Sequence, residues 1–320
     1  MITIDDIDIF VLSYNREKYI VEAINSLINQ TIGRFRIQVL DNGSTDNTKK
    51  TIQLLNNPDI LFLGSDKNHG ALWNFERAQK LASKKYVVLF HDDDLIHPKY
   101  LEYVLKVLNR NPEVSIVCSG TKSTDEPDPK TWLDYNYNPI IFNKLSYFTS
   151  LVYLGFPLNF ATVIYTTEFF KSSKIDFEQY GKVADRPLVY DCVKSGKVVL
   201  LAGQYIQYRI HADQDSKNNI SGPFYNETLA LHKKYKRIIY KDNSFIPKIF
   251  FLVNFYRYLS EEHSRFVDKK LLLHEYISMA VREMKITKFE LFISKLFYFS
   301  KMYIVYKVYR LIKREFGEYS

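Results

Sequence analysis

Residues 86–94 read Tyr-Val-Val-Leu-Phe-His-Asp-Asp-Asp, an apolar run that ends in three consecutive acids. The apolar run predicts a buried strand, and the acids then lie at its carboxyl end, where open α/β sheets bind their ligands. Oxygen donors grouped in one short turn suit Mg²⁺ or Mn²⁺, particularly when a phosphate supplies the remaining ligands. The alternative is an exposed turn with a helix cap, because Asp is common in both.

On both sides of this stretch, the first 120 residues alternate between strand and helix patterns. Strands are expected over residues 7–12, 35–40, 60–63, 86–90 and 114–118. Helices are expected over residues 17–29, 46–55, 72–81 and 98–108. This alternation predicts an α/β fold with a mostly parallel sheet and helices on both of its faces.

Beyond residue 120 the pattern changes. Residues 119–143 are rich in Asp, Pro, Thr and Asn, and we expect either a long loop that covers a site or a surface loop. Mixed structure follows, with helices expected over residues 145–154 and 187–194 and strands over residues 161–165, 198–201 and 204–210. From residue 224 the pattern is almost wholly helical. We therefore expect a domain over residues 1–220 and a helical region over residues 221–320.

Composition restricts the class of protein. A chain of 320 residues with 46% hydrophobic residues can bury a substantial core. Cys118 and Cys192 both lie in apolar segments, so we expect neither a disulfide framework nor a zinc site, and a reducing compartment. Residues 1–8 lack the basic start of a signal peptide, and no apolar run reaches the roughly 18 residues of a membrane-spanning helix. A cytoplasmic protein is expected.

The net charge of +8 is unevenly distributed, because residues 1–220 sum to −1 and residues 221–320 to +9. Residues 285–320 combine Lys and Arg with many Phe and Tyr, which is typical of a helix at a membrane surface. The alternative is a helix pair that packs on the first domain or on a second copy of the chain. Nucleic acid is not an expected partner, because no nucleic-acid module is recognisable.

Groups of polar residues directly follow the predicted strands. These groups are Ser13-Tyr14-Asn15-Arg16, Asp41-Asn42-Gly43-Ser44-Thr45-Asp46, Asp66-Lys67-Asn68-His69-Gly70 and His91-Asp92-Asp93-Asp94. A parallel sheet brings the carboxyl ends of its strands to one edge, which predicts a cleft for a nucleotide with a metal at its phosphates. Neither a Walker P-loop nor a dinucleotide-binding glycine motif is present.

In order and spacing, these groups resemble the motifs of family 2 glycosyltransferases with the GT-A fold, over about residues 7–215. Ala184-Asp185-Arg186-Pro187 and Tyr208-Arg209-Ile210-His211 are similar to later motifs of bacterial members. The resemblance implies a GT-A fold, that is, a Rossmann-like, mostly parallel sheet flanked by helices, with a C-terminal helical extension. It also implies a nucleotide-sugar half over about residues 1–120 and an acceptor half over about residues 121–220.

The resemblance implies roles for individual residues as well. The nucleotide-sugar donor would lie beside Ser13, Tyr14, Asn15, Arg16, Asp41, Lys67, Asn68, Gly70 and Asp92. Mn²⁺ or Mg²⁺ would be held by Asp93, Asp94 and His211, with Asp93 the first choice for a direct bond. Asp185 would be the catalytic base, and the alternative for this residue is an ordinary helix N-cap.

This sequence departs from the family at His91, where many members carry an Asp two residues before the metal-binding Asp. The division of roles among Asp92, Asp93 and Asp94 therefore stays open. For His91, the resemblance leaves both a ligand role and a structural role.

The resulting hypothesis is a metal-dependent, inverting hexosyl- or N-acetylhexosaminyltransferase with a donor that is UDP-linked by default. Its acceptor would be a hydroxyl of a glycan or a lipid-linked glycan in surface-polysaccharide synthesis, such as O-antigen or capsule, at the inner face of the cell membrane. One alternative is a sugar-nucleotide nucleotidyltransferase, although residues 13–18 lack the glycine-rich loop that such enzymes usually carry. The other is a non-catalytic carbohydrate-binding protein on the same fold. Oligomerisation and the identity of the sugar stay open.

Overall fold

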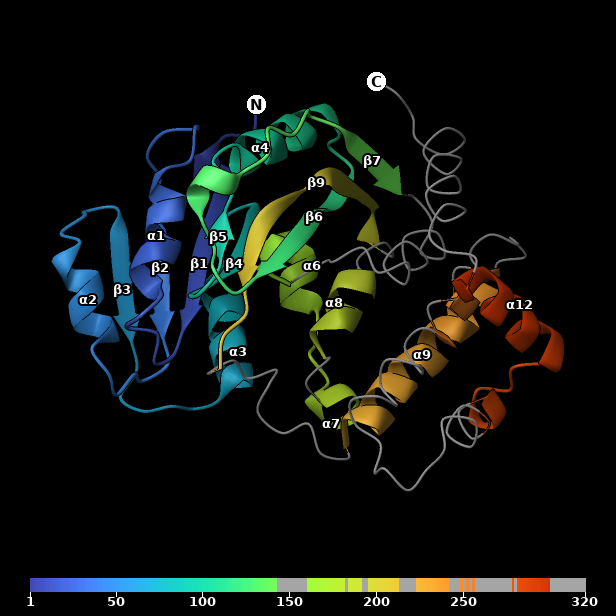
Figure 1. Cartoon of the computed structure of the whole chain (residues 1–320). Helices are drawn as coiled ribbons and strands as arrows, with labels where there is room; N and C mark the ends of the chain where they lie inside the picture. Colours follow the sequence, from blue (N-terminus) through green and yellow to red (C-terminus); the bar gives the residue numbers. More distant parts are fainter. Residues whose placement is uncertain are drawn as a thin grey trace. The chain divides into compact units, whose positions relative to one another are not determined.

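The computed structural model falls into two compact units (Figure 1). The structure describes residues 1–142, 160–181, 184–191, 195–212, 223–241, 248–249, 251–253, 255–256, 278 and 281–299. The first unit comprises residues 1–141, 157–174 and 195–211, and the second comprises the remainder. The helix expected over residues 145–154, Cys192 and residues 300–320 lie outside the described residues, and the domain boundary expected near residue 220 stays a prediction.

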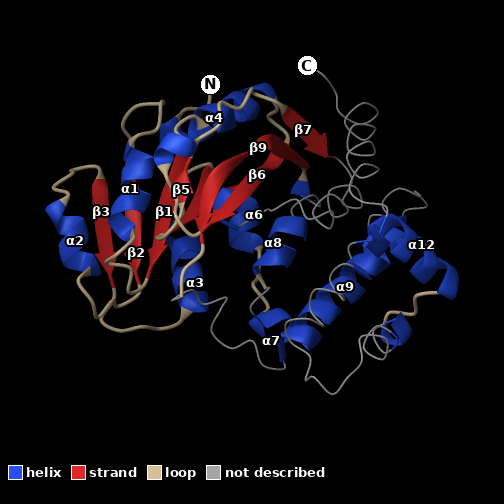
Figure 2. Cartoon of the chain, viewed as in Figure 1, coloured by secondary structure: helices blue, strands red, loops and turns tan. Residues whose placement is uncertain are grey.

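The described residues form a nine-stranded sheet (Figure 2) in the order β3-β2-β1-β4-β8-β6-β9-β5, with β7 paired to β9. The strands are β1 (Ile7–Ser13), β2 (Ile37–Asp41), β3 (Ile60–Gly64), β4 (Tyr86–His91), β5 (Leu95–Ile96), β6 (Val114–Thr124), β7 (Pro139–Phe142), β8 (Ile164–Thr166) and β9 (Lys197–Arg209). Strands β1 to β4 pair in parallel, whereas β8 runs antiparallel to both of its neighbours. The predicted α/β fold with a mostly parallel sheet is confirmed.

Helices cover both faces of the sheet, as the alternating side chains of its strands require. The first unit contains α1 (Ile20–Ile28), α2 (Thr48–Leu54), α3 (Ala71–Leu81), α4 (Tyr100–Arg110) and α6 (Thr167–Ser172). In β1, the side chains of Ile7, Ile9 and Val11 belong to one core cluster with residues of α1, α2 and α4. Successive strand residues point to opposite faces, so Asp8 and Phe10 face the other side, where α3 and α6 contact each other and the sheet.

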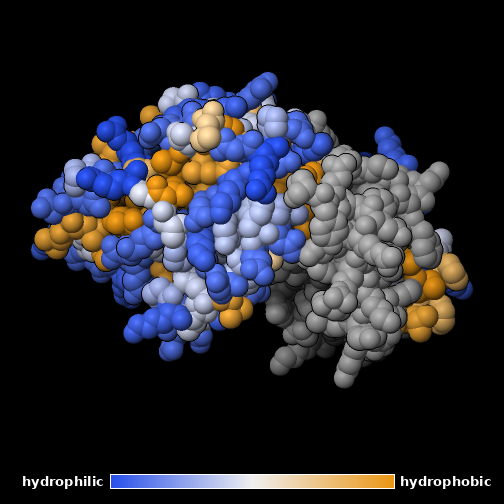
Figure 3. All heavy atoms as spheres, turned by 90° about the horizontal axis from the view of Figure 1, so that it is seen from above, coloured by the Kyte–Doolittle hydropathy of each residue, from blue (hydrophilic) through white to orange (hydrophobic). Residues whose placement is uncertain are grey.

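Apart from Phe142 at the end of β7, the second unit is mainly helical in its described residues, and the sequence predicts helices for its part from residue 224 onward. It contains α7 (Phe177–Tyr180), α8 (Asp185–Asp191), α9 (Pro223–Lys241) and α12 (Lys288–Phe299). The Lys234 ammonium of α9 lies 2.7 Å from the Asp191 carboxylate of α8, and the Tyr240 hydroxyl of α9 donates to Glu290 of α12. No helix that the structure describes is both long and apolar enough to cross a membrane. Figure 3 shows hydrophobic surface gathered where Figure 1 places α12.

The region expected to be a loop over residues 119–143 is a different structure. Strand β6 continues to Thr124 because residues 120–124 pair with β9, and β9 is one continuous strand rather than the two that were expected. The remaining loop does not present its aromatic side chains as a free surface, because Tyr135 and Tyr137 pack against the core cluster. The Tyr135 ring lies 5.1 Å from the ring of Tyr205 in β9. This segment therefore stabilises β9.

One buried carboxylate connects the start of β1 to the turn before β4. Asp8 is 3% exposed, and its Oδ2 accepts hydrogen bonds from the backbone N–H groups of Ser83 at 2.6 Å and Lys84 at 2.9 Å. Its Oδ1 accepts from the side-chain amide of Gln38 at 3.3 Å. Asp8 therefore satisfies backbone donors that would otherwise be left unpaired next to the centre of the sheet.

Changing Asp8 to Ala should lower the free energy of unfolding by about 3 kcal/mol, since two backbone donors lose a charged acceptor. Urea unfolding followed by circular dichroism measures the loss. Asp5→Ala is the matched control, because Asp5 is an exposed acid three residues earlier and its removal should cost less than about 0.5 kcal/mol. Equal midpoints for the two variants would contradict this role of Asp8.

Candidate functional site

The polar groups predicted to converge do lie at one edge of the sheet. Neighbouring strands end at matching positions, because Ser13 pairs with Asp41 and Asp41 pairs with Gly64. Leu12 at the end of β1 pairs with His91 at the end of β4. The segments that follow β1, β2, β3 and β4 are thus neighbours, so the polar groups converge at one edge of the sheet as predicted.

The three consecutive acids after β4 are buried, so the exposed-turn alternative is wrong. Asp92, Asp93 and Asp94 are 6%, 8% and 6% exposed. Asp92 Oδ2 accepts from the backbone N–H of Tyr14 at 3.1 Å, and Asp94 Oδ1 accepts from the backbone N–H of Arg209 at 2.9 Å. These bonds connect the acids to the segment after β1 and to the end of β9.

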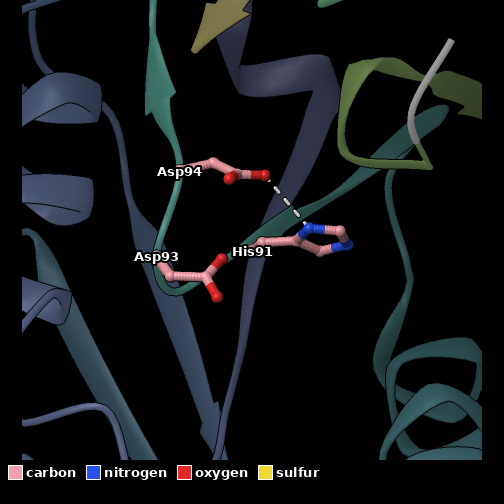
Figure 4. Close-up of side chains that lie close together, drawn as sticks. All are labelled: His91, Asp93 and Asp94. Carbon is pink, nitrogen blue, oxygen red and sulfur yellow. Dashed lines mark hydrogen bonds and ion pairs between the residues drawn. The ribbon is translucent and has the colours of Figure 1, made fainter. Parts of the chain in front are cut away.

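Two histidines bind different acids of this group. The Nδ1 atom of His91 lies 3.1 Å from Asp94 Oδ2, and Figure 4 shows this contact with the Asp93 carboxylate beside it. The Nε2 atom of His211 lies 3.0 Å from Asp93 Oδ2, and both of these side chains are buried. His211 comes from the segment after β9, and the structure brings it against Asp93, while its predicted role at a metal stays a prediction.

Two arginines place further positive charge against the acids. The Nε atom of Arg16 lies 3.4 Å from Asp92 Oδ1 and 3.5 Å from Asp93 Oδ2. The Nε atom of Arg209 donates to the backbone carbonyl of Asp93 at 2.9 Å, and its Nη2 pairs with Glu22 of α1. Arg209 is therefore fixed by an ion pair, and it holds the main chain of the acidic turn.

Burial and mutual repulsion perturb these titrating groups. Burial, followed by the nearby charge of Asp93, raises the pKa of Asp92 to about 7. Burial also raises the pKa of Asp94, against the opposing hydrogen bond from His91. For His91, burial favours the neutral ring, but the hydrogen bond and charge of Asp94 outweigh it and raise the pKa to about 9. The turn therefore holds more negative charge than its surroundings stabilise, which favours a bound cation.

The donor atoms of this turn fit a divalent cation. Ligand atoms of His91, Asp93 and Asp94 all lie within 4.8 Å of one another. The second ring nitrogen of His211, Nδ1, is buried and has no hydrogen-bond partner among the described residues. Carboxylate and imidazole donors together suit Mn²⁺ and related ions. Both oxygens of Asp94 already accept hydrogen bonds, so Asp93 is the stronger candidate for a direct bond, and His211 lies against Asp93 but outside this group of three.

The segments after β1 and β2 hold each other in place. Asn15 adopts a positive φ of 52°, and its backbone N–H donates to the Ser44 hydroxyl at 2.8 Å. Ser44 in turn donates from its backbone N–H to Asp41 Oδ2 at 3.0 Å. The backbone N–H of Arg16 donates to the Thr48 hydroxyl at 2.8 Å. Ser13 and Asp41 are buried beside these bonds, and Tyr14 is partly exposed.

Asn42 connects the segment after β2 to the segment after β3, and sequence reasoning did not single it out. Its Nδ2 donates to Asn68 Oδ1 at 2.9 Å and to the Gly70 carbonyl at 3.0 Å. Its Oδ1 accepts from the backbone N–H of His69 at 3.1 Å. Lys67 is exposed in this segment. The asparagine was visible in the motif, but the side-chain contacts that give it a role span 26 to 28 residues.

Glu22 is a second residue that sequence reasoning missed. It lies 187 positions from Arg209, and nothing in its local sequence marks it as a neighbour of the site. Asp185 begins α8 in the second unit and is partly buried there. Its assignment as catalytic base stays a prediction.

Residues 8–165 match the family profile described as Glycosyl transferase family 2. An uncharacterized glycosyltransferase of Haemophilus influenzae is 24% identical over 284 residues, which cover 85% of this chain and 86% of that protein. Chondroitin synthase of Escherichia coli is 27% identical over 184 residues. Those residues are 56% of this chain and 26% of the synthase, so the chain spans about a quarter of that relative's length.

Among solved structures, S. aureus TarS 1–349 in complex with UDP-GlcNAc is similar, with a TM-score of 0.62. The sequences are 18% identical, and the likeness covers 87% of this chain and 80% of that one. At this identity the likeness shows a shared fold, and it confirms the expected GT-A architecture.

Gly43 allows the segments after β2 and β3 to approach each other closely. Its φ is +71°, and a Cβ atom built there would lie 2.3 Å from the carbonyl carbon of Lys67. Gly43→Ala should therefore lower the free energy of unfolding by at least about 2 kcal/mol, through backbone strain and collision together. Gly33→Ala is the matched control, because Gly33 has a φ of +89° with no atom within 4 Å, so only strain applies. Equal losses in urea unfolding would contradict the close approach.

Asp92→Asn tests the electrostatic perturbation of the acidic turn. A carboxyl group whose pKa is raised on folding binds its proton more tightly in the folded state, so stability falls as pH rises from its ordinary value of 3.8 towards about 7. The Asp92→Asn variant lacks this loss of folding stability. Its free energy of unfolding, measured in metal-free buffer, should therefore rise relative to that of the wild-type chain as the pH rises from 3.8 to about 7. Asp125→Asn, an exposed acid, should run parallel to the wild type. A parallel profile for Asp92→Asn would refute the perturbation.

Proposed function

We propose that this chain, as a member of glycosyltransferase family 2, moves a sugar from a nucleotide sugar to a hydroxyl of a glycan or lipid-linked glycan. The donor is a UDP-linked hexose or N-acetylhexosamine, the configuration at the anomeric carbon inverts, and a divalent cation is required. The observation that carries this proposal is the buried contact between Asp93 and His211 at the carboxyl edge of the sheet. The product would belong to a surface polysaccharide such as O-antigen or capsule, made at the inner face of the cell membrane.

The donor lies, in this proposal, along the ends of β1, β2 and β3. Asp41 accepts a hydrogen bond from the base, and its carboxylate is already oriented by Ser44. The side chains of Ser13, Asn15 and Arg16 and the backbone near Tyr14 border the nucleotide. Lys67, Asn68 and Gly70 border the ribose and diphosphate, and Asn42 holds two of these residues in place. A complex of TarS with UDP-GlcNAc supports the choice of a UDP-linked donor.

Asp93 and His211 would hold the cation, with Asp94 as a supporting acid and Asp92 directed to the ribose. When bound, Mn²⁺ or Mg²⁺ neutralises the charge that develops on the departing nucleoside diphosphate. The protein supplies the rest of the electrostatics. Arg16 lies beside Asp92 and Asp93, and Arg209 fixes the main chain that carries the metal ligands.

Asp185 acts as the base in the proposed reaction. It accepts the proton of the acceptor hydroxyl as the oxygen attacks the anomeric carbon from the side opposite the diphosphate. One displacement with inversion needs no covalent intermediate on the protein. The oxygen gains the bond to the sugar, and the bonding electrons of the old glycosidic bond leave with the diphosphate.

Transfer from labelled nucleotide sugars to a panel of lipid-linked acceptors in the presence of Mn²⁺ tests the proposal. Asp185→Asn should lower transfer by about a hundredfold or more, because general-base catalysis contributes this much, and it should leave UDP binding with Mn²⁺ unchanged. Asp93→Asn should abolish both transfer and Mn²⁺-dependent UDP binding. Asp125→Asn, an exposed acid, is the control for the loss of one negative charge.

Nuclear magnetic resonance of the product determines whether the anomeric configuration has inverted. Full transfer by Asp93→Asn or Asp185→Asn would overturn the residue assignments. Retention of configuration would overturn the single-displacement mechanism.

A further inference from the structure

Helix α12 exposes three large apolar side chains. Phe289, Phe292 and Leu296 are 70%, 60% and 53% exposed, and their spacing of three and four residues places them on one face of the helix. These three side chains are named here the α12 stripe. Figure 3 shows hydrophobic surface at the place of this helix. An exposed apolar row of this kind on a helix indicates a surface that contacts a membrane or another molecule.

Two polar side chains of α12, Glu290 and Ser294, lie away from the stripe and point inward. Ser294 is buried, and its hydroxyl donates to the Leu291 carbonyl at 2.7 Å. Glu290 accepts hydrogen bonds from the Tyr240 hydroxyl of α9 and from the backbone N–H of Thr287. In an ordinary surface helix the apolar face packs on the core and the polar face meets water. The α12 stripe instead faces outward, so hydrophobic burial among the described residues does not explain it.

Basic residues lie beside the α12 stripe. Lys288 and Lys295 are seven positions apart, so they lie on the same side of the helix, along one border of the stripe. Arg282 and Lys285 are exposed just before the helix. The two acids of the segment are engaged, because Glu283 pairs with Lys233 at 3.1 Å and Glu290 bonds Tyr240. The surface therefore combines exposed Phe and Leu with Lys and Arg that form no ion pair with a described acid, and the Lys295 ammonium lies 6.0 Å from the centre of the Tyr256 ring.

We propose that the α12 stripe docks the enzyme on an anionic lipid surface. Phenylalanine and leucine side chains enter the boundary between headgroups and acyl chains, while Lys288 and Lys295 extend to the lipid phosphates. Charge complementarity selects this occupant. A symmetric contact between two copies would place two sets of the same four basic residues in one interface, where their like charges repel.

Co-sedimentation of the full chain with lipid vesicles tests the docking surface. The wild-type chain should bind vesicles in which about a third of the phosphatidylcholine is replaced by phosphatidylglycerol, and bind phosphatidylcholine alone at least about tenfold more weakly. The triple change Phe289→Ser, Phe292→Ser and Leu296→Ser should weaken binding about tenfold or more. Lys288→Glu with Lys295→Glu keeps the stripe but should weaken binding by a similar factor.

Leu54→Ser is the matched control, because Leu54 is a leucine of α2 that is 75% exposed and lies in the first unit. This variant should bind vesicles like the wild type, and circular dichroism should show that every variant is folded. Undiminished vesicle binding by the triple variant would overturn the proposal. So would a wild-type dimer in light scattering that the triple variant converts to a monomer, because the stripe would then belong to a contact between copies.

Discussion

The burial of three adjacent carboxylates at the end of β4 is the constraint on which the site depends. Neighbouring negative charges removed from water repel one another, and they are tolerated only where other groups approach them closely. Here those groups come from separate parts of the chain, namely Arg16 after β1, and Arg209 and His211 at and after the end of β9. Satisfying the acids therefore brings β1, β4 and β9 into one arrangement, on which the proposed binding of a nucleotide and a cation depends.

The three buried acids are only partly neutralised by nearby positive charge, and this imbalance connects stability to function. Asp92 and Asp94 hold their protons more tightly than carboxyl groups in water, so the turn is electrostatically incomplete. A cation bound by Asp93 and His211 would complete it and would act on the diphosphate from the same position. Arg209 supports this function through its backbone contact to Asp93, and its own side chain is fixed by Glu22. Structural support for the ligands thus comes from α1, an element that carries no predicted site residue.

The sequence was sufficient where local periodicity determines the structure. In β1, Ile7, Ile9 and Val11 alternate with residues of the opposite face, and polar groups after β1 to β4 converge because parallel strands end together. It was insufficient where partners are distant. Residues 120–124 look like part of a loop, yet they continue β6 because β9 pairs with them. The contact of Glu22 with Arg209 likewise depends on three-dimensional packing, and local composition carries no record of it.

The central claim is that the acids after β4 bind a divalent cation together with a nucleoside diphosphate. The direct measurement is titration of the full chain with Mn²⁺, followed by the electron paramagnetic resonance signal of the free ion, with and without UDP. Because coupling between two ligands is reciprocal, UDP should tighten Mn²⁺ binding by about tenfold or more, and Mn²⁺ should tighten UDP binding by the same factor. Mn²⁺ binding that UDP leaves unchanged, or that persists in Asp93→Asn, would contradict the account.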